Sequence, residues 1–190
     1  MSSTYPPLDW AKLATYASAP FPHGWNPDEY VMFSPRDLGV HQAILDVVSS
    51  TAHSLLGNHF GFTDPDVAAA AETKLNDPNI VCVINLDDRQ EAGPTEKALV
   101  TKDFTPEIGT SVAIGHSIHN AISHLKVWVV DALYIISGST NLSLGGEQKQ
   151  DNELRITRNA LMAARYSDVI MLNHLAMLAQ MKAKAAPAPA

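Results

Sequence analysis

The residues best suited to chemistry lie close together between His124 and Asn141. They follow the pattern H-x-K-x4-D-x6-G-S-x-N, which comprises His124, Lys126, Asp131 and the run Gly138-Ser139-Thr140-Asn141. A neutral imidazole can attack phosphorus, and a covalent intermediate divides one difficult displacement into two easier ones. A lysine can offset the charge of a transferring phosphoryl group. The pattern therefore predicts a phosphoryl-transfer site in which His124 is the nucleophile.

Two neighbouring strands must position these side chains. The apolar segments 125–130 and 133–137 are predicted strands, joined by a turn at Asp131-Ala132. Residues two apart on a strand point to the same face. His124 and Lys126 can therefore share one side, the first as nucleophile and the second as phosphate clamp.

The residues after the second strand suit phosphate binding. Ser139 and Asn141 are also two apart, and their hydroxyl and amide can donate hydrogen bonds to non-bridging oxygens. Gly138 would let the backbone pass close to the substrate. Asp131 has two possible roles, catalytic and structural, and its place in a hairpin turn favours the structural one.

Helices alternate with strands along the rest of the chain, which predicts an α/β fold with a mixed β-sheet flanked by helices on both faces. A helix is expected to start at Ser34-Pro35, with Ser34 as N-cap, and a second at Asp64-Pro65. A long helix should span 159–182. Further strands are expected at 55–62, 79–86 and 154–157. A polar loop at 90–104 is expected after the strand at 79–86.

The length of 190 residues favours a single main domain, and 46% hydrophobic with 17% charged residues indicates a globular chain. We expect an irregular N-terminal arm at 1–30, a catalytic domain at 31–182 and a disordered Ala/Pro tail at 183–190. The sequence shows no secretory signal or membrane-length apolar run, and its one cysteine is Cys82, so a cytoplasmic location is expected. The net charge of −7 argues against a broad nucleic-acid-binding surface, although a local basic cleft remains compatible with it.

At the H-x-K-x4-D-x6-G-S-x-N residues the sequence resembles the phospholipase D superfamily, whose signature is this HKD motif. The run Phe62-Thr63-Asp64-Pro65-Asp66-Val67, the strand end Asp87-Asp88-Arg89 and Asn152-Glu153-Leu154 resemble corresponding parts of its small bacterial endonucleases. The resemblance covers roughly 31–180 and implies a phospholipase D-like sandwich. It departs at Ala132, where the family often has glycine.

This resemblance also implies metal-independent transfer through a phosphohistidine, without a cofactor. In the family, two HKD histidines meet across a pseudo-two-fold axis, one attacking and the other protonating the leaving group. This chain has one HKD half, so we expect a homodimer with a composite active site. Glu153 would hold the other ring nitrogen of His124, although a solvated strand-edge glutamate is the alternative.

Three functions remain open. A phosphodiesterase that cuts nucleic acid is favoured, and a phospholipase D or phosphatidyltransferase that acts on phospholipids is the alternative. A catalytically silent DNA-binding or scaffold module is the third, and the intact motif argues against it. His116 and His119 could form a metal site with His124, but no cysteine or acidic ligand joins them locally, so no metal site is predicted.

Overall fold

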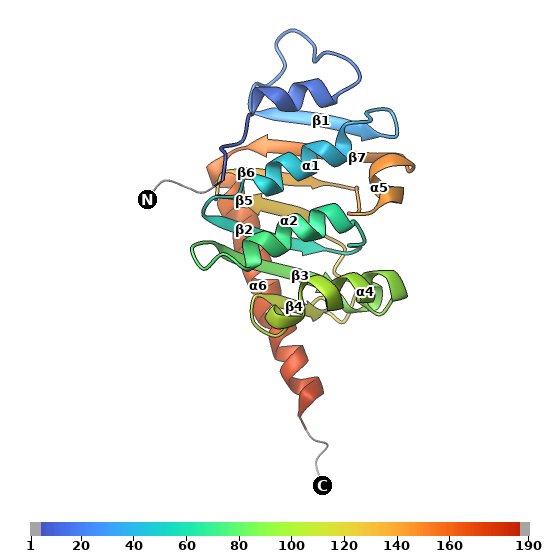
Figure 1. The fold of residues 1–190 in the computed structure, drawn as a ribbon, viewed down its shortest axis with the longest axis vertical. Helices are drawn as coiled ribbons and strands as arrows, with labels where there is room; N and C mark the ends of the chain where they lie inside the picture. The colour runs from blue at the N-terminus through green and yellow to red at the C-terminus, as the bar shows by residue number, and fades with distance from the viewer. Residues whose placement is uncertain (1–4, 187–190) are drawn as a thin grey trace.

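The computed structural model describes residues 5–186 and has a seven-stranded mixed sheet at its centre (Figure 1). The strand order is β1-β7-β6-β5-β2-β3-β4. The pairs β2–β3 and β3–β4 are parallel, and the other neighbours are antiparallel. The strands are β1 (Glu29–Ser34), β2 (Ser54–His59), β3 (Val81–Asp87), β4 (Val112–Gly115), β5 (Lys126–Val130), β6 (Tyr134–Gly138) and β7 (Asn152–Arg158).

Helices cover both faces of the sheet, as the sequence predicts. In Figure 1, α1, α2, α4 and α5 lie in front of the strands and α6 crosses behind them. Over residues 5–186, no helix combines the length and the hydropathy that crossing a bilayer requires. The helices are α1 (Val40–Ser49), α2 (Pro65–Leu75), α3 (Asp88–Glu91), α4 (Pro94–Asp103), α5 (Leu144–Gln148) and α6 (Ala160–Ala185), with 3-10 turns at Ala11–Tyr16 and Thr105–Glu107.

Strand β5 is buried on both faces because each face meets a different hydrophobic core. Val127 and Val129 pack in the core under α6, whereas Trp128 and Val130 pack in the core under the front helices. This explains its unbroken apolar sequence. On neighbouring β2, a Cβ at Gly57 would collide with the indole of Trp128, so the central strand pair requires glycine there.

The helix expected at Ser34-Pro35 begins later than predicted. Ser34 is the last residue of β1, and α1 starts at Val40. Between them, the carboxylate of Asp37 accepts the backbone amides of Ser18 and Phe33, both at 2.7 Å. Asp37 therefore stabilises a turn at the position where the sequence pattern predicts the first helical turn.

The second predicted helix start is confirmed. The side chain of Asp64 accepts hydrogen bonds from the backbone amides of Asp66 and Val67 at 2.8 and 2.9 Å, and Pro65 occupies the first turn of α2. This is an N-cap, which satisfies amide groups that have no partner within the helix. It also fixes Asp64 and Asp66 at the amino end of α2.

The predicted loop at 90–104 is wrong, because α4 occupies most of it. Pro94 lies in the first turn of α4, and Leu99 and Val100 are buried in the front core. Of its four charged residues, Lys97 and Lys102 are exposed, whereas Glu96 and Asp103 are buried. These charges mask the short apolar stripe in the sequence.

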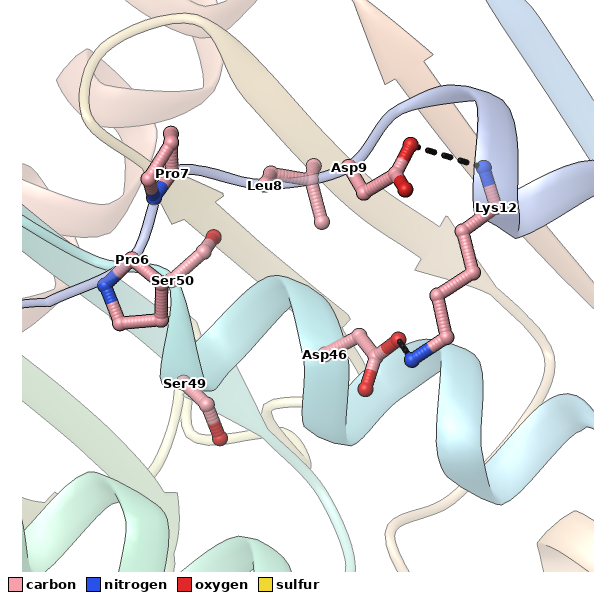
Figure 2. Close-up of a pocket in the computed structure, with 8 residues that line it drawn as sticks. All are labelled: Pro6, Pro7, Leu8, Asp9, Lys12, Asp46, Ser49 and Ser50. Atoms are coloured by element: carbon pink, nitrogen blue, oxygen red, sulfur yellow. Dashed lines mark hydrogen bonds and ion pairs between the residues drawn. The ribbon is translucent and has the colours of Figure 1, made fainter.

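The N-terminal segment packs along the front helices and the first strand. Figure 2 shows a pocket of about 200 Å³ between Pro6–Asp9 and the carboxyl half of α1. Lys12 reaches across its rim to Asp46, with Nζ 2.7 Å from the carboxylate. The region predicted as an irregular arm thus contains a 3-10 turn and the first residues of β1, which starts at Glu29.

Candidate active site

The motif residues gather at one end of the sheet because β6 runs antiparallel to both of its neighbours, β5 and β7. β5 begins at Lys126, β6 ends at Gly138 and β7 begins at Asn152. The start of β5, the end of β6 and the start of β7 therefore lie side by side. Five of the six candidate catalytic residues belong to this end of the sheet: His124, Lys126, Ser139, Asn141 and Glu153.

His124 and Lys126 form the centre of this group. The imidazole of His124 is exposed and its ring lies 4.6 Å from the ring of Phe60. Lys126 is only 8% exposed, and its Nζ donates a hydrogen bond to the His124 carbonyl at 3.1 Å. Burial lowers the pKa of Lys126. A buried ammonium interacts more strongly with a nearby phosphate than a solvated one would.

The turn after β6 is held by β7. The backbone amide of Ser139 donates to the Glu153 carbonyl at 3.0 Å, and the Glu153 amide donates to Ser139 Oγ at 2.9 Å. Gly138 has a φ of +146°, and a Cβ there would collide with the Glu153 carbonyl. Glycine is therefore required for this close approach, which presents the exposed Ser139 hydroxyl at the sheet end.

Asn141 follows on a loop that is fastened to the segment after β2. The backbone amides of Thr63 and Asp64 donate to the Leu142 carbonyl at 2.7 and 3.0 Å, and the Leu142 amide donates to Gly61 at 3.1 Å. Asn141 Oδ1 is buried and has no hydrogen-bond partner among residues 5–186. The carboxamide of Asn141 is thus positioned by its backbone and keeps hydrogen-bonding capacity.

Glu153 lies in this group without contacting the nucleophile. Its carboxylate is 3.3 Å from Nε of Arg155, and its side chain is 40% exposed. Within residues 5–186, no hydrogen bond joins it to His124. A single chain therefore does not display the orienting contact expected for Glu153.

Asp131 lies at the opposite end of β5. Its carboxylate accepts the backbone amides of Ala52, His53 and Ser54 at 2.7 to 3.2 Å. Its φ of +51° places it in the tight turn between β5 and β6. This position supports the structural role: Asp131 fastens the start of β2 to the β5–β6 hairpin.

His59 also belongs to the sheet end, and sequence reasoning missed it. It is the last residue of β2 and pairs with Lys126 in the β2–β5 register. It is 1% exposed, and neither ring nitrogen has a hydrogen-bond partner in the described chain. Burial and then the charge of Lys126 lower the pKa of His59 to about 3. No local motif marks His59, because only the pairing of distant strands brings it to Lys126.

This buried histidine predicts a loss of stability in mild acid. The pKa of His59 is about 3 in the folded state against 6.5 for an unperturbed histidine, so between these values the unfolded chain binds more protons. The free energy of unfolding should therefore fall as the pH drops below about 6.5, by up to about 1.4 kcal/mol per pH unit from this residue. Urea unfolding at pH 7 to 4.5 should show a shallower pH dependence in His59→Leu. Equal slopes in the two proteins would contradict this.

His116, His119 and His124 do not form a shared ligand group among the described residues. His116 Nδ1 is 3.0 Å from Asp88, whereas His119 is exposed. Among residues 5–186, the side chains close enough to share a metal ion are His41, Asp64 and Asp66. That group contains none of the histidines that sequence reasoning considered.

Known protein structures share this architecture. No family model and no curated protein sequence matches the chain. Nuc from Salmonella typhimurium, a phospholipase D family member, superposes with a TM-score of 0.65 at 20% identity, over 76% of this chain and 92% of Nuc. The chain has the phospholipase D fold. NucT from Helicobacter pylori shares it, with a TM-score of 0.64 at 16% identity over 78% of this chain and 96% of NucT.

The phospholipase D fold also occurs within longer proteins. A phosphatidylserine synthase from Haemophilus influenzae matches with a TM-score of 0.55 at 16% identity, over 77% of this chain but 38% of the synthase. These identities establish the fold alone. The chemistry of this chain therefore has to be argued from its own residues at the sheet end.

Proposed function

We propose that this chain is a metal-independent phosphodiesterase that acts through a phosphohistidine at His124, with nucleic acid as the favoured substrate. The observation that carries the proposal is the pairing of an exposed imidazole at His124 with the buried ammonium of Lys126. This pair lies at the end of the central strands of a phospholipase D fold.

The proposed reaction has two displacement steps. In the first, a neutral imidazole nitrogen of His124 forms a bond to phosphorus, the bond to the leaving oxygen breaks, and that oxygen takes a proton from an acid. In the second, water attacks phosphorus, the phosphorus–nitrogen bond breaks, and the water proton returns to the acid. Lys126 offsets the phosphoryl charge, while Ser139 and Asn141 donate hydrogen bonds to its oxygens.

The acid would be the second His124, supplied by a homodimer. The outward side of α6 supports this, because it exposes large apolar side chains, with Leu172 68% and Leu175 62% exposed. Contiguous exposed apolar surface of this kind is typical of an interface. The exposed apolar face of α6 comprises Leu161, Met162, Val169, Met171, Leu172 and Leu175.

Hydrogen bonds connect the sheet-facing side of α6 to the residue that precedes the nucleophile. Asn173 of α6 donates to Asn58 Oδ1 at 3.0 Å, and Asn58 Nδ2 donates to Ser123 Oγ at 3.0 Å. Ser123 precedes His124 directly. In the proposed dimer, the two-fold axis lies beside α6 and brings two copies of His124 together.

The choice of substrate depends on the charge of the cleft and on the proteins that the chain resembles. Two copies of Lys126 in one cleft would give a local positive potential despite the net charge of −7. Resemblance to the small endonucleases favours nucleic acid. The likeness to a phosphatidylserine synthase keeps a phospholipid as the second candidate.

Hydrolysis in excess EDTA tests the proposal. The side chains supply nucleophile, acid and phosphate ligands, so activity should persist after metal removal. Plasmid DNA, RNA and phosphatidylcholine vesicles are incubated separately with the protein, and circular dichroism in the same buffer verifies that it stays folded. DNA or RNA cleavage is the expected result. Loss of activity in folded protein, with rescue by a divalent metal, would overturn metal independence, and cleavage of the lipid alone would favour the second candidate.

A further inference from the structure

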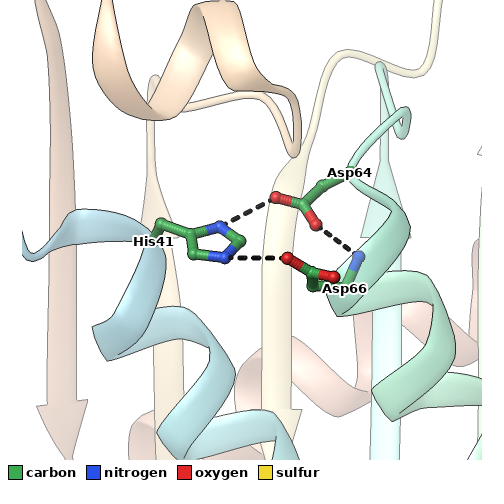
Figure 3. A group of neighbouring side chains, drawn as sticks. All are labelled: His41, Asp64 and Asp66. Carbon is green, nitrogen blue, oxygen red and sulfur yellow. Dashed lines mark hydrogen bonds and ion pairs between the residues drawn. The ribbon is translucent and has the colours of Figure 1, made fainter.

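One imidazole and three carboxyl groups form a cluster beside the loop that carries Asn141. Figure 3 shows three of its members, with His41 of α1 facing Asp64 and Asp66 at the amino end of α2. His41 Nδ1 lies 2.9 Å from Asp64 Oδ2 and 2.6 Å from Oε2 of Glu147, a residue of α5. The other ring nitrogen, Nε2, lies 3.4 Å from Asp66, whose side chain is 70% exposed. The imidazole of His41 thus links three helices.

The inner part of this cluster is buried and compensates its own charge. The side chains of Asp64 and Glu147 are 5% and 0% exposed. Burial lowers the pKa of His41, but the hydrogen bond to Glu147 and the charge of Asp64 raise it by more. Burial and then the charge of Asp64 raise the pKa of Glu147 to about 8. These shifts favour a charged imidazole and a protonated Glu147 beside the Asp64 carboxylate near neutral pH, so no buried carboxylate is left without a partner.

Two members of the cluster lie next to the backbone contacts that hold Asn141. The backbone of Gly146 packs so closely on Asn141 that a Cβ at Gly146 would lie 2.4 Å from the Asn141 carbonyl oxygen. Glu147 follows Gly146 directly in α5. On the other side, Asp64 donates its backbone amide to the carbonyl of Leu142, the residue after Asn141, at 3.0 Å. A displacement of α5 relative to α2 would therefore move Asn141.

We propose that His41 and Glu147 are positioning residues for Asn141, which hold its carboxamide where the substrate phosphate binds. This inference rests on the proposed function, in which Asn141 donates a hydrogen bond to a phosphate oxygen. Asn141 Oδ1 is buried and has no hydrogen-bond partner in the part of the chain that the structure describes. No hydrogen bond fixes this oxygen, so the place of the carboxamide depends on its backbone and on the helices packed around it. Sequence reasoning missed both positioning residues, because 106 positions separate His41 from Glu147.

The positioning role and a purely structural role predict different results. If the cluster only stabilised the fold, a substitution of His41 would lower the free energy of unfolding and leave the activity of each folded molecule unchanged. If the cluster acts through Asn141, the same substitution should slow the reaction, since a misplacement of about 1 Å can cost about a hundredfold in rate. That loss should disappear once the carboxamide of Asn141 is absent, because two residues that act through one contact are not additive.

A double-mutant cycle measures this coupling. Single-turnover rates of DNA cleavage are compared for the wild type, His41→Gln, Asn141→Ala and the double variant, each corrected for its folded fraction by circular dichroism. His41→Gln keeps a polar side chain of similar size and should fold, but it cannot carry the imidazolium charge. Asn141→Ala should lower the rate about 10²- to 10³-fold, the usual loss for one such donor. His41→Gln should lower it at least about tenfold in the wild type and less than about twofold in Asn141→Ala.

Gln42→Ala is the matched control for the cycle. Gln42 is the exposed neighbour of His41 on α1, and its carboxamide donates to Asp46 at 2.9 Å, outside the cluster. This variant should keep the wild-type rate within about twofold. Equal losses from His41→Gln in the two backgrounds, or no loss per folded molecule in either, would overturn the proposal.

The side-chain amide signals of Asn141 give a readout that does not require activity. They are assigned in ¹H–¹⁵N correlation spectra by their absence in Asn141→Ala. These signals should shift in His41→Gln and stay in place in Gln42→Ala, and unshifted signals in His41→Gln would overturn the proposal. A wild-type chain that cleaves no phosphodiester would defeat the proposed function instead, and the shift in His41→Gln would then still support the positioning of Asn141.

Discussion

Replacing His124 by Asn should lower the turnover of phosphodiester hydrolysis by about four orders of magnitude or more. The carboxamide cannot form the covalent bond to phosphorus, and in the proposed dimer the same substitution removes the acid. The side chain of His124 is exposed and makes no buried hydrogen bond in the described structure, so the fold should survive. Single-turnover assays on the preferred substrate measure the effect, and circular dichroism verifies folding.

His119→Asn is the matched control for this substitution. His119 is also an exposed histidine in the segment before β5. Its replacement should leave activity within about twofold of the wild type, the size expected for a residue outside the reaction. Activity of His124→Asn within about tenfold of wild type would contradict our assignment and direct the search for a nucleophile to other residues.

Mixed dimers should show the second large effect. If wild-type and His124→Asn chains are unfolded together and refolded at equal amounts, random pairing makes about half of the dimers mixed. Each mixed dimer lacks one of two required imidazoles. Total activity should therefore fall to about one quarter of that of an equal amount of wild-type protein, whereas independent sites would retain about one half. Tagged mixed dimers can be isolated and assayed directly.

A charged substitution on α6 can test the proposed dimer interface. Leu172 and Leu175 lie in the exposed apolar face of α6, so Leu172→Glu should favour monomers and abolish activity together. Sedimentation at the concentration of the assay measures the oligomeric state, and the hydrolysis assay measures activity. A fully active monomer would contradict the composite site, and an acid would then have to lie within the chain. Lys182→Glu, an exposed position in the last turn of α6, is a control that should leave the dimer intact.

Local patterns in the sequence were sufficient to predict the class of fold. The apolar segments around β5, β6 and α6 are long and strongly patterned, and Asp64-Pro65 is a complete capping signal. The start of α1 could not be predicted, because Asp37 stabilises a turn through contacts with Ser18 and Phe33. Such contacts depend on tertiary structure and leave no local pattern.

The same distinction applies to the candidate site. His124, Lys126, Ser139 and Asn141 are recognisable because they lie at the ends of two adjacent strands and their spacing is local. His59 is not recognisable, because it reaches Lys126 only through the β2–β5 pairing.

The residues of the HKD motif lie at opposite ends of β5 and have different roles. Lys126 begins the strand at the end that holds His124, while Asp131 follows its last residue and binds three backbone amides of the segment before β2. Under the proposed chemistry, selection on catalysis would act on His124 and Lys126, and selection on folding would act on Asp131. A descendant that abandoned phosphodiester chemistry could lose His124 freely but would still need Asp131, so a surviving aspartate alone would be a record of shared architecture rather than of retained activity.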